Sequence, residues 1–257
     1  MGRLLATGDI HGWEGSWWKL REECFPEGAG LGKDDVLLVT GDVAACFHCG
    51  ADAAPRAGER GQGEALFREW LESRPWTPVF VDGNHENHEA RANLPVAEWH
   101  GGLVHRVSPS VMHLMRGQAY RIPVTGADGE EAVRTVFAMG GARSTDRALR
   151  TEGVSWWPSE LPTYDEIDAA EATLDALGWE VDVVATHAQP PEVAAAALGD
   201  WLVARDTDRL TAWLGYVRDR LSYGLWLSGH LHVDEDVLGG RDMVLFDRVV
   251  DVGALLA

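Results

Sequence analysis

Aspartate, asparagine and histidine residues recur in five short motifs along the chain. The motifs are GDIHG at 8–12, GDV at 41–43, GNHE at 83–86, TH at 186–187 and GHLH at 229–232. Carboxylate, amide and imidazole groups together suit first-row transition metals, and an aspartate can bridge two ions. The motifs therefore predict a centre of two divalent metal ions. The candidate residues are Asp9, His11, Asp42, Asn84, His85, His187, His230 and His232.

Apolar stretches typical of buried strands lead into these motifs. Residues 3–9, 36–42 and 77–86 have this form, and 181–187 returns to it. Helix-like stretches around 14–24 and 63–73 separate the first three, so the first 90 residues are expected to alternate between strand and helix. Open α/β sheets place their sites at the carboxyl ends of the strands.

The spacing within two motifs gives a reason for the ligands to converge. In the tripeptides D-I-H and H-L-H, an extended backbone would point both outer side chains to the same side. Asp9 and His11 would then bind the same ion. The glycines beside the ligands would let the backbone turn sharply and come close to the metals.

The rest of the chain completes an α/β pattern. Short strands are expected over 104–140 in an antiparallel arrangement, with a hairpin turn in GADG at 126–129. Thr163 and Glu166 form a capping box before a helix that runs to Leu177. A further helix is expected over 206–220, and the end of the chain is expected to be β again. We expect one domain over residues 1–257, with the aperiodic loop 50–63 as a candidate lid.

In this order, the five motifs resemble the calcineurin-like metallophosphoesterases, and the match spans residues 8–232. The resemblance implies an α/β fold, a four-layer α/β/β/α sandwich of two mixed β-sheets flanked by helices. It also implies a hydrolase in which a hydroxide that bridges the metals attacks a phosphoester, with His85 protonating the leaving oxygen. Manganese is the expected metal, with iron, zinc, nickel or cobalt as alternatives. One ion would be held by Asp9, His11, Asp42 and His232, and the other by Asn84, His187 and His230, with Asp42 bridging.

The second motif departs from one branch of this family. GNHE is similar to the serine/threonine protein phosphatases, but GDVAACF has Ala45 where those enzymes have an aspartate that orients the catalytic histidine, and no arginine follows. This argues against protein-phosphatase activity and leaves His85 in need of another partner. Residues 140–146 and 155–162 are instead similar to a group of bacterial and phage metallophosphoesterases.

Substrate contacts are expected from Arg143, Asn84 and His48. A guanidinium group matches two phosphate oxygens at once, and Arg143 lies beside two glycines. A surface salt bridge is the alternative for Arg143, and it is the favoured interpretation for Arg116 and Arg150.

Other polar and aromatic residues carry weaker signals. Cys46, His48 and Cys49 could hold a third metal, but two thiols and one imidazole lack a fourth ligand, so a loop that touches the pocket is the simpler interpretation. If one tryptophan pair lines the pocket, Trp156 and Trp157 are the candidates.

The charge of the chain limits its substrates. The chain has 22 basic and 41 acidic residues, a formal charge of −19, which opposes the non-specific attraction that long nucleic acids need. A small phosphorylated substrate such as a nucleotide is therefore favoured over a nuclease substrate. A non-catalytic scaffold is a third hypothesis, which the intact ligand set disfavours.

Composition also bears on the compartment. No apolar run reaches the roughly 18 residues of a membrane span, so no membrane partner is expected. Three cysteines are too few for a disulfide framework, which agrees with a reducing, cytoplasmic location. The oligomeric state stays open.

Overall fold

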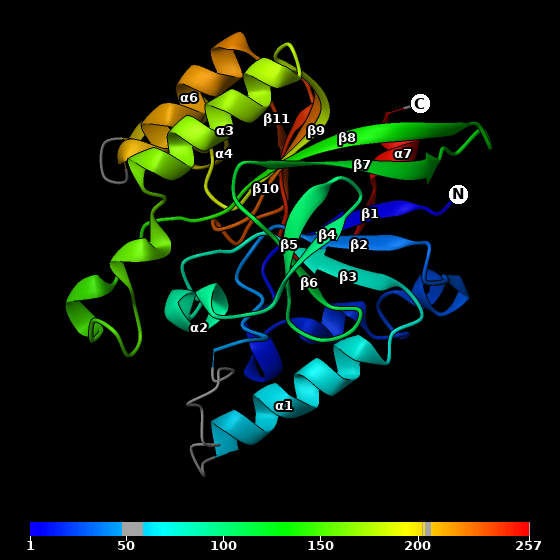
Figure 1. Cartoon of the computed structure of the whole chain (residues 1–257), viewed down its shortest axis with the longest axis horizontal. Helices are drawn as coiled ribbons and strands as arrows, with labels where there is room; N and C mark the ends of the chain where they lie inside the picture. Colours follow the sequence, from blue (N-terminus) through cyan, green and yellow to red (C-terminus); the bar gives the residue numbers. More distant parts are fainter. Residues whose placement is uncertain (48–58, 202, 204–206, 257) are drawn as a thin grey trace.

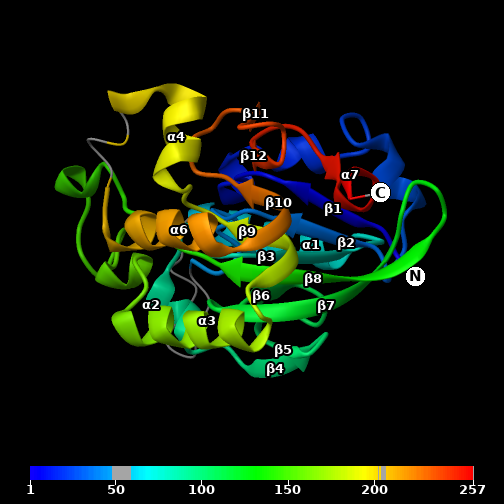
Figure 2. The ribbon, with the colours of Figure 1, turned by 90° about the horizontal axis from the view of Figure 1, so that it is seen from above.

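Two β-sheets pack face to face in the computed structural model, and helices cover their outer faces (Figure 1). The structure describes residues 1–47, 59–201, 203 and 207–256. Helices α3, α4 and α6 lie over one sheet and α1 lies beneath the other (Figures 1 and 2). The expected four-layer α/β/β/α sandwich is confirmed.

The seven-stranded sheet has the order β13-β1-β2-β3-β6-β5-β4. Strands β1, β2, β3 and β6 are parallel, and β4, β5 and β13 are antiparallel to their neighbours. The parallel run brings the first three motifs to one edge of the sheet. The strand bounds are β1 Leu4–Thr7, β2 Val36–Val39, β3 Thr77–Phe80, β4 Val96–Trp99, β5 Gly102–Arg106, β6 Met112–Leu114 and β13 Val250–Asp251.

The six-stranded sheet has the order β11-β12-β10-β9-β8-β7. Strands β8, β9, β10 and β12 are parallel, while β7 and β11 are antiparallel to their neighbours. The GADG turn joins β7 to β8 as expected. The strand bounds are β7 Gln118–Thr125, β8 Glu131–Met139, β9 Glu180–Thr186, β10 Ser222–Ser228, β11 Glu235–Val237 and β12 Asp242–Val244.

Three apolar layers hold the sandwich together. Side chains such as Leu4 and Leu227 fill the space between the sheets, Leu174 and Trp226 belong to the layer under α3 and α6, and Phe67 belongs to the layer above α1. None of the helices in the described part of the chain has the length and apolar character that crossing a membrane requires. The helix bounds are α1 Glu59–Glu72, α2 His88–Ala92, α3 Tyr164–Ala176, α4 Pro191–Leu198, α6 Arg209–Arg220 and α7 Val252–Leu255.

Two local predictions need correction. Residues 14–24 do not form an α-helix; the 3-10 helices Gly12–Glu14 and Trp17–Leu20 take their place. The buried Lys19 ammonium donates to the carbonyls of Gly8 and Asp9, which ties this segment to the first motif. The proposed loop 50–63 is also too long, because α1 begins at residue 59. Residues 50–58 lie outside the described part of the chain.

The helix predictions near the other sheet are confirmed. Thr163 accepts a hydrogen bond from the Glu166 backbone, and the Glu166 carboxylate accepts one from the Thr163 backbone, so the capping box is present at the start of α3. Asp208 caps α6 in the same way.

Candidate metal centre

Strands from both sheets end at one cluster of polar side chains. Possible ligand atoms of Asp9, His11 and His232 lie within 4.8 Å of one another, and so do those of Asp9, Asp42 and His187. Asp9 and His11 follow β1, Asp42 follows β2, and His187 follows β9. The convergence that the motifs predicted is therefore present in the fold.

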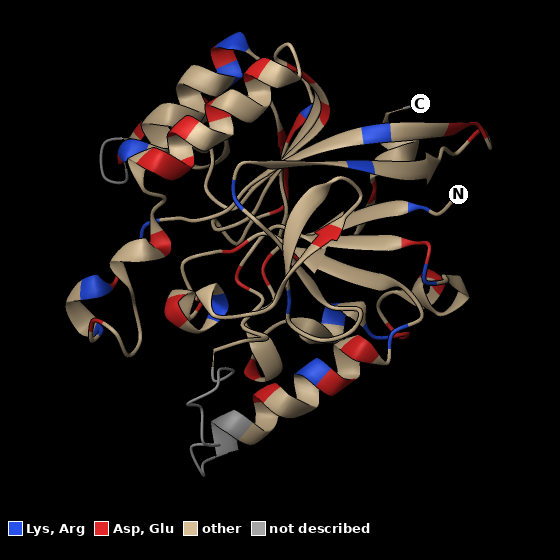
Figure 3. Ribbon diagram, in the orientation of Figure 1, with Lys and Arg blue, Asp and Glu red and all other residues tan. Residues whose placement is uncertain are grey.

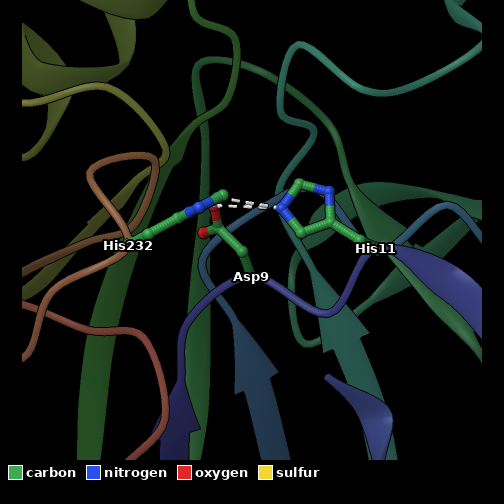
Figure 4. A group of neighbouring side chains, drawn as sticks. All are labelled: Asp9, His11 and His232. Atoms are coloured by element: carbon green, nitrogen blue, oxygen red, sulfur yellow. Dashed lines mark hydrogen bonds and ion pairs between the residues drawn. The ribbon is translucent and has the colours of Figure 1, made fainter. Parts of the chain in front are cut away.

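The first group is built around the Asp9 carboxylate. Its Oδ2 atom lies 3.1 Å from Nε2 of His232 and 3.8 Å from Nε2 of His11. The two Nε2 atoms are 2.9 Å apart. Figure 4 shows both imidazoles pointing toward Asp9 from opposite sides. This group is a set of donors that faces a common point, as metal ligands do.

The second group is built around His187. Its Nδ1 atom donates to the carbonyl of Thr40 at 2.7 Å, which leaves Nε2 with a lone pair when the ring is neutral. Nε2 faces the Asp42 carboxylate at 3.4 Å and Oδ1 of Asn84 at 3.2 Å. Three acceptors that meet in this way need a shared positive charge, either a proton on His187 or a metal ion.

His230 lies slightly apart from these groups. Its ring packs against His187 with the centroids 5.0 Å apart, and its backbone N–H donates to Oδ1 of Asp9 at 3.0 Å. Among the described residues, His230 joins none of the three close groups of possible ligand atoms.

Burial and mutual charge set the protonation of the cluster. Burial raises the pKa of Asp42, but the charge of His187 and a hydrogen bond to it outweigh this and hold the pKa well below its usual range. Burial also raises the pKa of Asp9, but the charge of His187 and the contact with His232 outweigh it, so the pKa is lowered. Burial lowers the pKa of His187, but Asp42 and Asp9 raise it to about 10. Two buried carboxylates therefore stay charged and favour a cation between them.

A further observation indicates that these residues suit divalent ions. Oδ2 of Asp9 is buried, and within the part of the chain that the structure describes its neighbours His232 and His11 make no hydrogen bond of regular geometry to it. A buried carboxylate oxygen without a hydrogen bond is costly unless a cation balances it.

The backbone at the site is strained. His11, Asp42, His230 and His232 have φ values of 59°, 49°, 65° and 54°, in the left-handed region that residues other than glycine seldom adopt. The prediction that D-I-H and H-L-H are extended segments is therefore wrong in its geometry. Asp9 and His11 still meet, because the turn at His11 brings its ring back over Asp9.

Two glycines allow the carboxylates to be approached closely. A Cβ at Gly83 would lie 2.0 Å from Oδ1 of Asp42, and one at Gly229 would lie 2.3 Å from Oδ1 of Asp9. In place of a side chain, the following backbone N–H groups donate to these oxygens: His85 to Asp42 at 2.7 Å and His230 to Asp9 at 3.0 Å. The glycines thus make room for the hydrogen bonds that orient both aspartates.

His85 lies at the edge of the first group. Its ring is 5.0 Å from the ring of His11, and its ring nitrogens are close enough to Asp42 and His11 to share an ion with them. Burial lowers the pKa of His85, and the nearby Arg150 lowers it further, while Asp42 opposes both effects. The geometry is compatible with His85 as a proton donor and also with His85 as a ligand.

Arg150 contacts His85, but as a cation and a donor it cannot replace the aspartate that is absent at position 45. Its Nη2 atom lies 2.9 Å and 3.0 Å from the two ring nitrogens of His85, and Asp146 binds its Nε at 2.7 Å. No sequence pattern pointed to this contact, although Ala45 indicated that His85 needed another partner.

The other predicted substrate contacts differ in outcome. Arg143 lines a pocket together with His230, Gln189 and Asp208, so it borders the site. Arg116 instead binds the carboxylate of Asp82 at 2.6 Å, so a salt bridge is present, but it is buried and not at the surface as expected.

Asn84 contacts Ser144 through its side-chain amide at 3.3 Å, which leaves Oδ1 directed at His187. Trp157 is buried against Phe47, and Trp156 packs under Arg147, so both serve packing. The predictions for His48 and Cys49 fall outside the described residues.

Comparison with known proteins agrees with this geometry. The family model described as calcineurin-like phosphoesterase matches residues 2–234. No curated protein matches the chain. The chain is similar to a phosphopantetheinyl hydrolase from Mycobacterium tuberculosis, with a TM-score of 0.43, 16% identity, and coverage of 95% of this chain and 88% of that one.

It is also similar to a candidate 5'-nucleotidase from Staphylococcus aureus in complex with alpha-ketoglutarate, with a TM-score of 0.45 and 11% identity. That match covers 95% of this chain but only 48% of the other. The family match covers most of the chain and all five motifs, so the chain belongs to the calcineurin-like phosphoesterases, a family of phosphoester hydrolases.

Proposed function

We propose that the chain hydrolyses small phosphorylated substrates, nucleotides included, with two divalent metal ions held at this cluster. The observation that carries the proposal is the pair of buried, charged carboxylates, Asp9 and Asp42, with imidazoles on both sides. Asp9, His11, Asp42 and His232 would hold one ion. Asp42, Asn84, His187 and His230 would hold the other, with Asp42 between them. When bound, the ions would draw in phosphoryl oxygens and activate water near neutral pH.

The side chains around the ions have separate tasks in this proposal. Asn84 is fixed by Ser144, which in turn donates to the fully buried carboxylate of Glu160. His85 would give a proton to the leaving oxygen, and its backbone N–H keeps Asp42 in place. Arg143 would contact the part of the substrate that enters the pocket beside His230.

A nuclease is the second candidate, and charge is the observation that bears on it. Figure 3 shows basic residues beside acidic ones on α1 and α6, and only acidic residues on α3. Mixed charge of this kind, with a net charge of −19, favours a small substrate over a long polyanion.

We also propose one domain over residues 1–257, because Leu4, Leu245 and Val252 share one core between the sheets. A cytoplasmic location, manganese as the native metal and the role of residues 50–58 stay predictions.

Metal removal and reloading test the proposal. Protein depleted with a chelator and reloaded with Mn²⁺ should bind two ions per chain, counted by mass spectrometry. Hydrolysis of nitrophenyl phosphate or its diester should return with the metal, because the metals carry most of the proposed chemistry. Activity that persists in fully depleted protein would contradict the proposal. Full metal binding without hydrolysis of any ester would favour the scaffold hypothesis instead.

A further inference from the structure

The segment between β8 and α3 reaches the metal centre from the six-stranded sheet. It is firmly held: the buried Glu160 binds Ser144 and Arg147, and the Arg150 guanidinium donates to the carbonyl of Ser155 at 3.1 Å. From this segment, Ser144 contacts Asn84 and Arg150 contacts His85, two neighbouring residues of the GNHE motif. The segment is therefore positioned by the fold to act at the site.

Arg150 is only partly satisfied by its neighbours. The Arg150 side chain is 13% exposed, and Asp146 neutralises it from the Nε side. The Nη2 atom carries two hydrogens and faces His85, and an imidazole ring offers at most one acceptor nitrogen in either protonation state. At most one Nη2 hydrogen can therefore bond to His85, and the other can donate to a bound anion. A guanidinium gains a charge-assisted hydrogen bond when an anion joins it.

We propose that Arg150 binds a phosphoryl oxygen of the substrate and makes the site specific for phosphomonoesters. The inference rests on the proposed function. A monoester has three terminal oxygens and a charge near −2, whereas a diester has two terminal oxygens and a charge of −1. If the two ions bind two of these oxygens, the third oxygen of a monoester would be free to accept from Arg150, which lies beside His85. A diester would place an ester group there, which would offer the guanidinium no charge.

The experiment compares two substrates with the same leaving group, nitrophenyl phosphate and bis-nitrophenyl phosphate. Arg150→Ala in the manganese-loaded protein should lower kcat/KM for the monoester by about 10- to 100-fold, the size of a lost charge-assisted hydrogen bond. The diester rate should change by less than about 3-fold, because no such bond is lost. Arg150→Lys should lie between the wild type and Arg150→Ala, since it keeps the charge without the planar fork.

A binding measurement separates substrate recognition from a structural role. Calorimetry with inorganic phosphate should show the affinity falling by about 10- to 100-fold in Arg150→Ala. The content of two Mn²⁺ per chain should be unchanged. Arg106→Ala is the matched control, because Arg106 is an exposed arginine on β5 that donates to the carbonyl of Pro109. It should leave both esters and phosphate binding at wild-type values.

The outcomes distinguish this inference from the function on which it rests. A wild-type protein that hydrolyses neither ester removes the proposed function. A wild-type protein that prefers the diester overturns the inference alone. So does an Arg150→Ala variant that affects both esters equally, affects neither, or loses manganese.

Discussion

Asp82 carries the largest stability prediction, because its carboxylate is fully buried between two arginines. One oxygen lies 2.6 Å from Nη1 of Arg91, and the other lies 2.6 Å from Nη2 of Arg116. His113 contacts the same carboxylate at 3.0 Å. Burial raises the pKa of Asp82, but the two arginines outweigh it and hold the pKa well below its usual range. The group is therefore a charged member of a buried ion cluster.

Asp82→Asn keeps the shape of the side chain and removes the charge. Arg91 and Arg116 would then be left without their main counter-ion in the protein interior. Breaking a buried pair in this way costs about 3–5 kcal/mol of unfolding free energy. In a domain of this size 1 kcal/mol shifts the melting temperature by roughly 2–4 °C, so we expect a decrease of about 6–20 °C.

Scanning calorimetry of metal-free protein measures this shift without interference from bound ions. Glu23→Gln is the control, because Glu23 pairs with Arg21 at 3.0 Å on the surface, where the pair is worth about 0–1 kcal/mol. Equal decreases in the two variants, or a decrease below about 2 °C for Asp82→Asn, would refute the reasoning that burial makes this cluster important.

Three further predictions concern pH and the proposed ligands. Burial, with the charge of Arg91, lowers the pKa of His113 to about 3, so between pH 6.5 and 3 the unfolded chain binds a proton that the folded chain excludes. Stability should fall as the pH falls through this window, by about 2 kcal/mol at pH 5, and His113→Asn should flatten the melting profile. Asp42→Ala should lose more bound metal than Asp9→Ala, and equal metal content would contradict the bridging role of Asp42. His85→Asn should keep both metals and lose about 10²- to 10⁴-fold in rate on an alkyl phosphoester but less on a nitrophenyl ester. A rate loss independent of the leaving group would remove His85 from the role of acid.

The sequence predicted the cluster of ligands because the information is local. Each motif directly follows an apolar strand, and parallel strands deliver their carboxyl ends to one edge, which brings Asp9 and Asp42 together. His187 follows β9 in the other sheet and meets them because the two sheets pack face to face. The reason given for the pairing of Asp9 with His11 was wrong all the same. Side-chain alternation assumes an extended backbone, and the strained turn at His11 is set by contacts with the second motif: its backbone N–H donates to the carbonyl of Asp42 at 2.7 Å.

Long-range contacts explain what the sequence did not reveal. Arg150 and His85 are separated by 65 positions, and the segment that joins them has no periodic pattern that fixes its path. The partner of Arg116 could not be foreseen from the sequence either. Nothing around it in the sequence indicates Asp82, which lies within the strand-like stretch 77–86 and to which no role was assigned.

The five motifs and the segment after β8 contribute to the site in different ways, and this difference bears on how substrate choice arises in this fold. The aspartates and histidines of the motifs lie at strand ends. Glycines let the backbone approach the aspartates closely, and backbone N–H groups donate to the aspartate side chains, so these positions tolerate little change. The segment after β8 reaches two residues of the GNHE motif through side chains, Ser144 at Asn84 and Arg150 at His85. A substitution in that segment can therefore change which ester is bound while the metal ligands keep their places. Loss of monoester preference without loss of metal in Arg150→Ala is the behaviour that this difference requires.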